Sequence, residues 1–390
     1  MQPKTEVKFD PKTFARLKRT IQQMLQGRQR CLADPGYASP LPLEIGLQLT
    51  NRCNLRCRHC FQWNQTGWHR QLKPAERKQD LDFDLIAKIV GQTAAARPNL
   101  YLWGGEPLSY SEWEPLTRLL EEHPLWTVLC TNGIELNKRM ESILRISAQL
   151  AVLVSIDGFE AENDALRGPG SYRRALGNLD ELLRLKRRRS FRGEVSIHCV
   201  LSEAIIPRLY DFMEYFEAKG VNTVYFCFPW YISPATAARM DEYFSRNFNW
   251  LREIGPDVPR SWYSYQYHLQ SEWVPALLDQ VKRLNERAWR VRIRFQPALE
   301  SDEIAPFVAG QEAPAQQRSL CLAVSQRMNV LPDGTVTACK LFPEFVIGDL
   351  RQEDVAVVWH SAPFRRAREL IHRGLMPVCS KCVLLYLHGN

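Results

Sequence analysis

The stretch LTNRCNLRCRHC at residues 49–60 contains three cysteines, Cys53, Cys57 and Cys60, in the spacing CxxxCxxC. Thiolates are soft ligands that suit zinc and iron-sulfur clusters. A structural zinc site closes with four protein ligands, and a cubane cluster has four irons to ligate, so three thiolates leave one coordination position open. The stretch therefore predicts a metal centre with a free position at which chemistry takes place.

Length and composition predict a self-contained α/β protein. The 390 residues suffice for one large domain and a smaller one, and an apolar content of 45% permits a substantial core. The charged N-terminus has no apolar signal segment, and no stretch reaches the about 18 apolar residues that a membrane span needs. Eleven cysteines without a secretory signal favour a reducing compartment over disulfide formation. We therefore expect a cytoplasmic protein without a membrane partner.

The net charge is +8, and the densest basic run extends from Lys186 to Arg189. Such a run is compatible with nucleic-acid binding. It falls at the end of a predicted helix, where cations complement the helix dipole, so we interpret it as a solvated face. The sequence thus disfavours nucleic acid as a partner. An iron-sulfur or zinc protein that binds RNA without catalysis stays open as an alternative from another class.

Short apolar runs alternate with helical patterns between residues 41 and 230. The helical stretches have apolar residues at spacings of three and four, which is typical of a buried stripe. Six β/α units with nearly continuous apolar strands predict a parallel sheet covered by helices, as in a partial (β/α)6 barrel. The six predicted strands are residues 41–50, 100–107, 126–133, 150–158, 194–201 and 222–229.

Chemically distinctive residues follow the first four predicted strands. The three cysteines follow the first strand, and GGEP at residues 104–107 follows the second. The sequence TNG at residues 131–133 ends the third strand, and SIDG at residues 155–158 ends the fourth. In barrels the loops after the strands converge on one mouth. We therefore expect these four segments to face one cavity.

These motifs resemble those of the radical S-adenosylmethionine (SAM) enzymes, and within them the branch with a C-terminal SPASM or twitch extension. The resemblance covers about residues 41–388. It implies a 4Fe-4S cluster whose open iron is chelated by S-adenosyl-L-methionine. The reduced cluster then cleaves this cofactor to a 5′-deoxyadenosyl radical, which abstracts a hydrogen atom from substrate. It also implies a flavodoxin- or ferredoxin-type reductant, and we predict a radical SAM oxidoreductase.

The resemblance also implies which residues bind S-adenosylmethionine. His59 stands where the family has an aromatic residue beside the adenine, and residues 104–106 stand where the family binds the methionine amino group. A guanidinium is well shaped for a carboxylate, and Arg167 matches a position that holds the carboxylate or the ribose. No catalytic acid, base or hydrogen donor is implied. The predicted cofactor-binding residues are His59, Gly104, Gly105, Glu106, Ser155 and Arg167.

A second group of cysteines lies near the C-terminus. Cys321 and Cys339 flank a predicted DGT hairpin turn, and Cys379 and Cys382 form a CxxC. Four thiolates make a complete tetrahedral set, which is also the pattern of a zinc ribbon. The spacing from Cys321 to Cys339 resembles the opening of SPASM, but the later SPASM cysteines are absent. The resemblance therefore implies the twitch form with one auxiliary iron-sulfur cluster, of the 4Fe-4S type, in preference to zinc.

The remaining cysteines lie singly in predicted helices or strands, and we interpret them as small buried hydrophobes of the core. They are Cys31, Cys130, Cys199 and Cys227.

These patterns divide the chain into four parts. Residues 1–40 form an N-terminal helical extension, and residues 41–230 form the radical SAM partial barrel. Residues 231–300 are an aromatic-rich helical insertion or barrel completion, placed to cover the barrel mouth. Residues 301–390 form a small twitch or SPASM-like domain with a β-hairpin and a helix. We thus expect an α/β protein.

The resemblance leaves the substrate open. Enzymes of this branch characteristically oxidise or crosslink ribosomally made peptides in natural-product maturation, and the aromatic-rich segment offers surface for such a peptide. The alternative is a small-molecule substrate, with this chain as a dehydrogenase or epimerase of a sugar or aminocyclitol.

Overall fold

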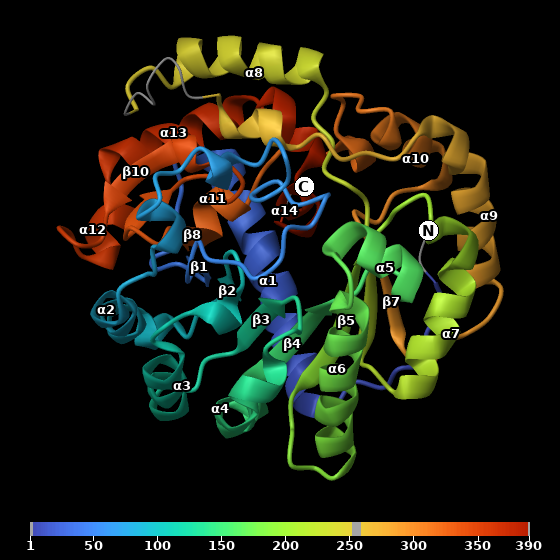
Figure 1. The fold of residues 1–390 in the computed structure, drawn as a ribbon. Helices are drawn as coiled ribbons and strands as arrows, with labels where there is room; N and C mark the ends of the chain where they lie inside the picture. Colours follow the sequence, from blue (N-terminus) through green and yellow to red (C-terminus); the bar gives the residue numbers. More distant parts are fainter. Residues whose placement is uncertain (1–2, 252–258, 389–390) are drawn as a thin grey trace.

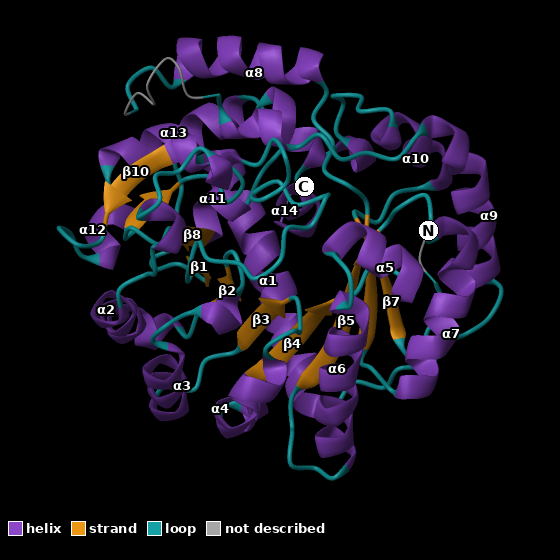
Figure 2. Ribbon diagram, in the orientation of Figure 1, coloured by secondary structure: helices purple, strands orange, loops and turns teal. Residues whose placement is uncertain are grey.

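The computed structural model describes residues 3–251 and 259–388, so residues 252–258 of the aromatic-rich segment lie outside the described residues. One ten-stranded sheet runs through the described part in the order β10-β9-β8-β1-β2-β3-β4-β5-β6-β7, with helices outside it (Figures 1 and 2). The strands are β1 (Glu44–Gln48), β2 (Asn99–Trp103), β3 (Thr127–Thr131), β4 (Leu150–Ser155), β5 (Glu194–Val200), β6 (Thr223–Cys227), β7 (Arg292–Gln296), β8 (Arg327–Val330), β9 (Thr335–Thr337) and β10 (Val346–Asp349).

The strands β1 to β7 are parallel neighbours in sequence order. The predicted partial barrel is thus confirmed, and β7, from the region 231–300, extends it by one strand. On the other edge β8 lies parallel to β1, and β9 and β10 continue antiparallel, so the predicted C-terminal hairpin joins the same sheet. The open sheet has β7 and β10 as its two edges.

Helices between the parallel strands pack against the sheet through apolar stripes, and α2 is an example. In α2 the side chain of Asp82 caps the N-terminus by accepting from Leu85 N, and Ile86, Ile89 and Val90 are buried. No described helix has both the length and the apolar content to cross a membrane. The α-helices are α1 (Pro11–Ala33), α2 (Phe83–Thr93), α3 (Trp113–Glu122), α4 (Met140–Arg145), α5 (Glu160–Arg167), α6 (Ser171–Arg187), α7 (Leu209–Lys219), α8 (Pro234–Asn247), α9 (Val274–Asn285), α10 (Ser301–Val308), α11 (Ala323–Gln326), α12 (Val355–Trp359), α13 (Ala362–Arg373) and α14 (Val383–His388).

The two faces of the central strands differ in burial. Along β3 and β4 fully buried residues alternate with half-buried ones, as expected for a period of two. The half-buried Cys130 and Ser155 line a cavity on the inner face. The strand register pairs Ser155 with His198 and Cys227 with Gln296, so the C-terminal ends lie level with one another. The loops after these strands therefore converge on one site.

Candidate active site

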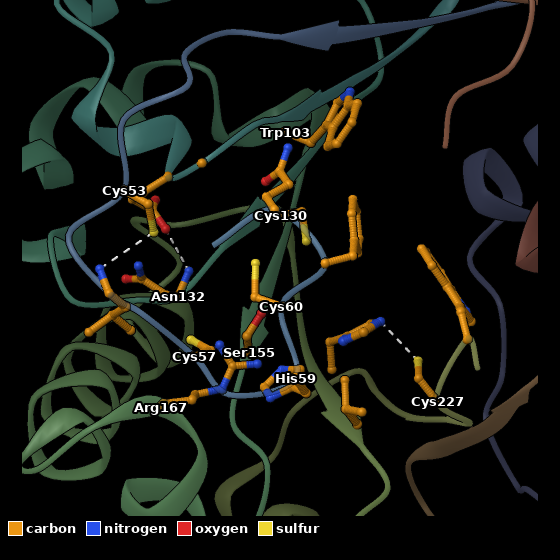
Figure 3. Close-up of a pocket in the computed structure, with 18 of the residues that line it drawn as sticks. Cys53, Cys57, His59, Cys60, Trp103, Cys130, Asn132, Ser155, Arg167 and Cys227 are labelled. Atoms are coloured by element: carbon orange, nitrogen blue, oxygen red, sulfur yellow. Dashed lines mark hydrogen bonds between the residues drawn. The ribbon is translucent and has the colours of Figure 1, made fainter. Parts of the chain in front are cut away.

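The loop after β1 carries the first three cysteines and is fixed by backbone hydrogen bonds. Asn51 N donates to Gln79 O at 3.0 Å, and Cys60 N donates to Cys57 O at 3.2 Å. Cys53, Cys57 and Cys60 line a cavity of about 240 Å³ (Figure 3). Burial raises the pKa of all three thiols, to about 12 for Cys57. A metal that binds here must therefore displace their protons.

The GGEP segment packs directly against this cysteine loop. Gly105 N donates to Thr50 O at 2.8 Å, and Glu106 N donates to Arg52 O at 2.7 Å. A Cβ on Gly105 would lie 2.1 Å from Arg52 O, and Gly104 has a φ of +149°. Both glycines line the cavity. Glycine is required at both positions because two backbone segments meet here and leave no room for a side chain.

Glu106 holds this turn against the end of β3. Its carboxylate accepts hydrogen bonds from Thr131 Oγ1 at 2.6 Å, Asn132 N at 2.8 Å and Leu108 N at 3.0 Å. Burial raises its pKa to about 7, although these donors favour the charged form. Glu106 thus faces the cavity with its oxygens already engaged in fixing two of the strand-end loops.

Asp157 organises the opposite side of the cysteine loop. Its Oδ2 accepts from Arg167 Nε at 2.6 Å and lies 3.5 Å from His59 Nε2, while Oδ1 accepts from Val200 N at 2.8 Å. Burial alone would raise the pKa of Asp157, but Arg167, His59 and the Val200 amide outweigh it, and the pKa is lowered. Asp157 therefore positions Arg167 and His59, a role that the sequence interpretation did not assign although it named the SIDG segment.

The structure brings together all the residues predicted for the first site. Each lines the same cavity, so the expectation that four strand-end segments share one mouth is confirmed. Their individual roles as cluster or cofactor ligands stay predictions. The residues are Cys53, Cys57, His59, Cys60, Gly104, Gly105, Glu106, Ser155 and Arg167.

The cavity has a further wall that the sequence interpretation assigned to the core. Cys227 Sγ lies 2.9 Å from His198 Nε2 and 3.3 Å from Gln296 Oε1, and Cys227 and His198 line the cavity (Figure 3). Burial lowers the pKa of His198 to about 4 and raises that of Cys227, so both are neutral near pH 7. Cys227 is buried as predicted, and Cys130 is only half-buried; both also line the cavity, which the core interpretation missed.

The other two single cysteines do lie in the core, as predicted. Cys199 belongs to the main apolar cluster, and Cys31 packs against Leu320 and Leu322 in a smaller one.

Aromatic side chains from the segments that follow β1 and β6 form another part of the cavity wall. Phe61 stacks on Tyr265 with ring centroids 4.7 Å apart and on Trp230 at 5.9 Å. Tyr267 lies 5.7 Å from the His59 ring. Phe61, Trp230, Tyr265 and Tyr267 all line the cavity, and the two tyrosines come from the region 231–300. That region therefore contributes both a sheet strand and part of the cavity wall.

The second group of cysteines surrounds a separate and much smaller cavity, of about 30 Å³. Cys321 precedes α11, Cys339 follows β9, and Cys379 and Cys382 lie at the 3-10 helix η12 (Pro377–Lys381). Burial raises the pKa of all four thiols. The rest of this wall is mainly apolar, including Val324, Leu341, Phe342, Ile371 and Met376.

Lys340 lies between the two sites and lines both cavities. Its Nζ stands 4.2 Å from the centre of the Tyr101 ring and 5.2 Å from that of Trp103. Burial lowers its pKa to about 8. One cation therefore contributes to the electrostatic environment of both cysteine groups.

The donor chemistry fits the cofactors that the motifs imply. All eleven cysteines are free. In the wall of the first cavity His59 Nδ1 and Trp103 Nε1 are buried without a hydrogen-bond partner among the described residues, so a polar ligand has groups to satisfy. Within the described residues, no three His, Cys, Asp or Glu side chains form a group that could hold a single metal ion.

Comparison with known proteins identifies two regions of the chain. Residues 47–202 match the radical SAM superfamily, and residues 321–383 match SPASM, described as an iron-sulfur cluster-binding domain. The AdoMet-dependent heme synthase of Methanosarcina barkeri is 27% identical over 84% of this chain and 85% of its own length. Mycofactocin maturase MftC of Mycolicibacterium smegmatis is 30% identical over 36% of this chain, and the match spans only 34% of the maturase. The Fe-coproporphyrin III synthase of M. barkeri is 27% identical over 45% of each chain.

Solved structures share the fold. The crystal structure of Streptococcus suis SuiB bound to S-adenosylmethionine has a TM-score of 0.57 at 13% identity, covering 92% of this chain and 73% of SuiB. Native anSMEcpe with bound AdoMet has a TM-score of 0.53 at 17% identity, covering 83% of this chain and 82% of that one. The two family models together span more than half of the chain: it belongs to the radical SAM superfamily, in the branch that carries a SPASM domain, and its cofactors are accordingly S-adenosylmethionine, a 4Fe-4S cluster and auxiliary iron-sulfur binding.

Proposed function

We propose that this enzyme is an oxidoreductase that cleaves S-adenosylmethionine reductively and removes a hydrogen atom from a substrate bound in the same cavity. The observation that carries the proposal is the convergence of three free thiols, a buried guanidinium and unpartnered polar atoms on that one cavity. When bound, the cofactor and its cluster supply the radical chemistry, which no side chain of the chain can supply alone.

In this proposal each part of the wall has a distinct task. Cys53, Cys57 and Cys60 hold three irons and leave one position free. Arg167, fixed by Asp157, presents a guanidinium to the carboxylate of the cofactor, and Ser155 offers a hydroxyl beside it. His59 lies beside this ion pair, with Nδ1 free for the ligand. Residues 104–106 hold the end of β2 against the cysteine loop, so the methionine amino group meets a rigid backbone.

The direct test is anaerobic reconstitution with iron and sulfide, followed by addition of dithionite and S-adenosylmethionine. We expect release of 5′-deoxyadenosine, measured by liquid chromatography. Absence of the product in a protein that carries its full iron content would overturn the proposal. Tight, salt-sensitive RNA binding together with that absence would favour the non-catalytic alternative.

We propose a peptide as the substrate. The aromatic wall of Phe61, Trp230, Tyr265 and Tyr267 suits amphipathic side chains and excludes water from a reactive radical. Among the structures that share the fold, SuiB has been solved bound to precursor peptide SuiA, and anSMEcpe with a Cp18Cys peptide.

A tetrapyrrole is the second candidate. The long match to a heme synthase and the match to a Fe-coproporphyrin III synthase favour it, and the same flat aromatic rings would suit a planar macrocycle. Incubation with iron-coproporphyrin III, and with any short precursor peptide encoded beside this gene, separates the two. We expect the mass of the peptide to change and that of the porphyrin to stay constant. The reverse result would replace the peptide proposal, and an aminocyclitol substrate would leave both masses unchanged.

We further propose that Cys321, Cys339, Cys379 and Cys382 ligate one auxiliary cluster completely. Four thiolates leave no iron open, so substrate cannot bind there directly. The apolar wall of this small cavity suits a centre that exchanges electrons and no atoms. Such a centre can accept the second electron when a substrate radical is oxidised. Its potential would depend on the charge around it, to which Lys340 contributes.

A further inference from the structure

The cysteine loop has a second, outer face that the proposed chemistry does not use. A groove on this face shares Cys53 with the inner cavity, so the loop separates the reaction space from the protein surface at this point. Five of the groove residues are cationic and none is acidic. The groove is lined by Arg52, Cys53, Arg56, Trp63, Arg70, Pro74, Arg77 and Lys78.

The positive charges of this groove are largely uncompensated. Arg52 pairs with Asp80, but within the described residues Arg56, Arg70, Arg77 and Lys78 form no ion pair, and all four are exposed. Elsewhere on the surface arginines are commonly paired with carboxylates, for example those at positions 145, 208 and 239. The unpaired cations therefore produce a local positive potential that attracts an acidic partner.

Two of these cations are also held in place by the loop itself. Arg56 Nη1 donates to the carbonyl oxygens of Cys53 and Leu55, both at 2.7 Å. Arg77 Nε donates to Leu72 O at 2.8 Å. Rigid charges lose little conformational entropy when a partner docks. The groove is thus a preorganised basic surface centred on a predicted cluster ligand.

We propose that this groove docks an acidic one-electron carrier protein that reduces the cluster. The inference rests on the proposed function, because a cluster that cleaves S-adenosylmethionine needs one electron from outside for each cleavage. In the docked complex the carrier is oxidised by one electron and the cluster is reduced by one electron. No bond forms and no proton moves at the interface. Entry through the groove brings the electron to Cys53 and leaves the inner cavity to cofactor and substrate.

A nucleic acid is also acidic, but the groove lacks the exposed aromatic rings on which the bases of a single strand stack. Single strands gain much of their affinity from bases stacked on exposed aromatic rings. The only aromatic ring of the groove, that of Trp63, is 5% exposed and is covered by the Arg56 guanidinium at 4.1 Å. Charge without a stacking surface favours a folded acidic protein.

The test uses a double charge reversal, Arg70→Glu with Lys78→Glu. These two side chains are exposed and donate no hydrogen bond within the described part of the chain, whereas Arg56 and Arg77 support the loop. The matched control is Arg187→Glu with Arg188→Glu, the same change in charge at the end of α6, away from the cysteine loop (Figure 1). Binding of purified flavodoxin and of a plant-type ferredoxin is measured by titration calorimetry at low and high salt.

In the second arm, 5′-deoxyadenosine release is measured with reduced flavodoxin or ferredoxin and with two small reductants, anionic dithionite and cationic reduced methyl viologen. We expect the groove variant to weaken carrier binding about tenfold at low salt. The ratio of the carrier-driven rate to the viologen-driven rate should fall by a similar factor. The control variant should keep both values close to those of the wild type.

Equal carrier affinity and an equal ratio of rates in the groove variant and the wild type would overturn the docking proposal. So would an equal loss in the control variant, because the effect would then be one of net charge alone. An RNA oligomer that binds the groove while neither carrier binds would overturn it as well. If the wild type releases no 5′-deoxyadenosine with either small reductant, the proposed function fails instead, and the calorimetric arm still decides whether the groove binds a carrier.

Discussion

The two cysteine groups are built in opposite ways. Cys53, Cys57 and Cys60 come from one short loop and face a cavity of about 240 Å³ whose aromatic wall also carries charged groups such as Glu106 and Arg167. The other four cysteines come from three segments spread over residues 321–382 and enclose about 30 Å³ of mainly apolar space. A site that admits a ligand needs room, an open coordination position and charged groups. A site that only exchanges electrons needs complete ligation and enclosure.

The largest effect that separates the two groups should come from Cys57→Ala. We expect release of 5′-deoxyadenosine to fall to background and bound iron to fall by about half, because the remaining two thiolates of the loop cannot hold a cubane cluster. Cys31→Ala is the control, since it also removes a buried thiol. Full activity of the Cys57 variant would remove the functional distinction between the groups.

The double variant Cys379→Ala with Cys382→Ala should have the complementary outcome. We expect loss of about half of the iron with 5′-deoxyadenosine release retained, because the first site keeps its three thiolates. Oxidation of substrate should be lost. Metal analysis of the wild type provides the check: stoichiometric zinc with no change in iron between the two proteins would show that the second group is a zinc site.

Asp157→Asn tests how the polar wall of the first site is stabilised. The substitution leaves the Arg167 guanidinium, 8% exposed, without its carboxylate, and breaking a buried pair typically costs about 3–5 kcal/mol. Chemical denaturation of the protein without cofactors measures the change. Asp180→Asn, which breaks the more exposed pair with Lys219, should cost less than about 1 kcal/mol. Equal costs for the two variants would contradict a special role for the buried pair.

Near neutral pH the smallest effect is that of His69, in the loop that follows β1. Burial lowers the pKa of His69 from 6.5 to about 3. Below pH 6.5 the unfolded chain therefore binds a proton at His69, whereas the folded chain binds it only near pH 3. The free energy of unfolding consequently decreases as the pH drops from 6.5 toward 3. His69→Phe should remove up to about 1.4 kcal/mol per pH unit from that slope. The exposed His123→Phe is the control, and an unchanged slope in the His69 variant would refute the assignment.

Sequence patterns predicted the features that are defined within one short segment. The three cysteines and the GGEP turn were recognised because their neighbours in sequence define them. The core positions of β3 and β4 could not be separated from cavity positions such as Cys130, because both faces of these strands carry apolar or small residues. His198 and Cys227 meet only because β5 and β6 pair in a particular register. The register between two strands that are distant in sequence cannot be predicted from either segment alone.

The roles of Asp157 and Glu106 illustrate the same limit at the level of side chains. Both were in or beside recognised motifs, yet their partners lie on other elements. Arg167 ends α5, Val200 ends β5, and Thr131 and Asn132 stand at the end of β3. The position of β8 beside β1 was also unpredictable, since a parallel pair needs no short connection.

The pairing of β8 with β1 sets a constraint on biosynthesis. Glu44 pairs with Arg327, 283 residues later in the chain, along an edge of β1 that no earlier strand occupies. During translation the N-terminal part of a chain emerges and folds first. The outer edge of β1 must therefore stay unpaired on the ribosome until most of the chain has been made, and an unpaired strand edge is a template for aggregation. Stop codons that remove residues after 300 should consequently yield insoluble protein, even though every strand from β1 to β7 is still encoded.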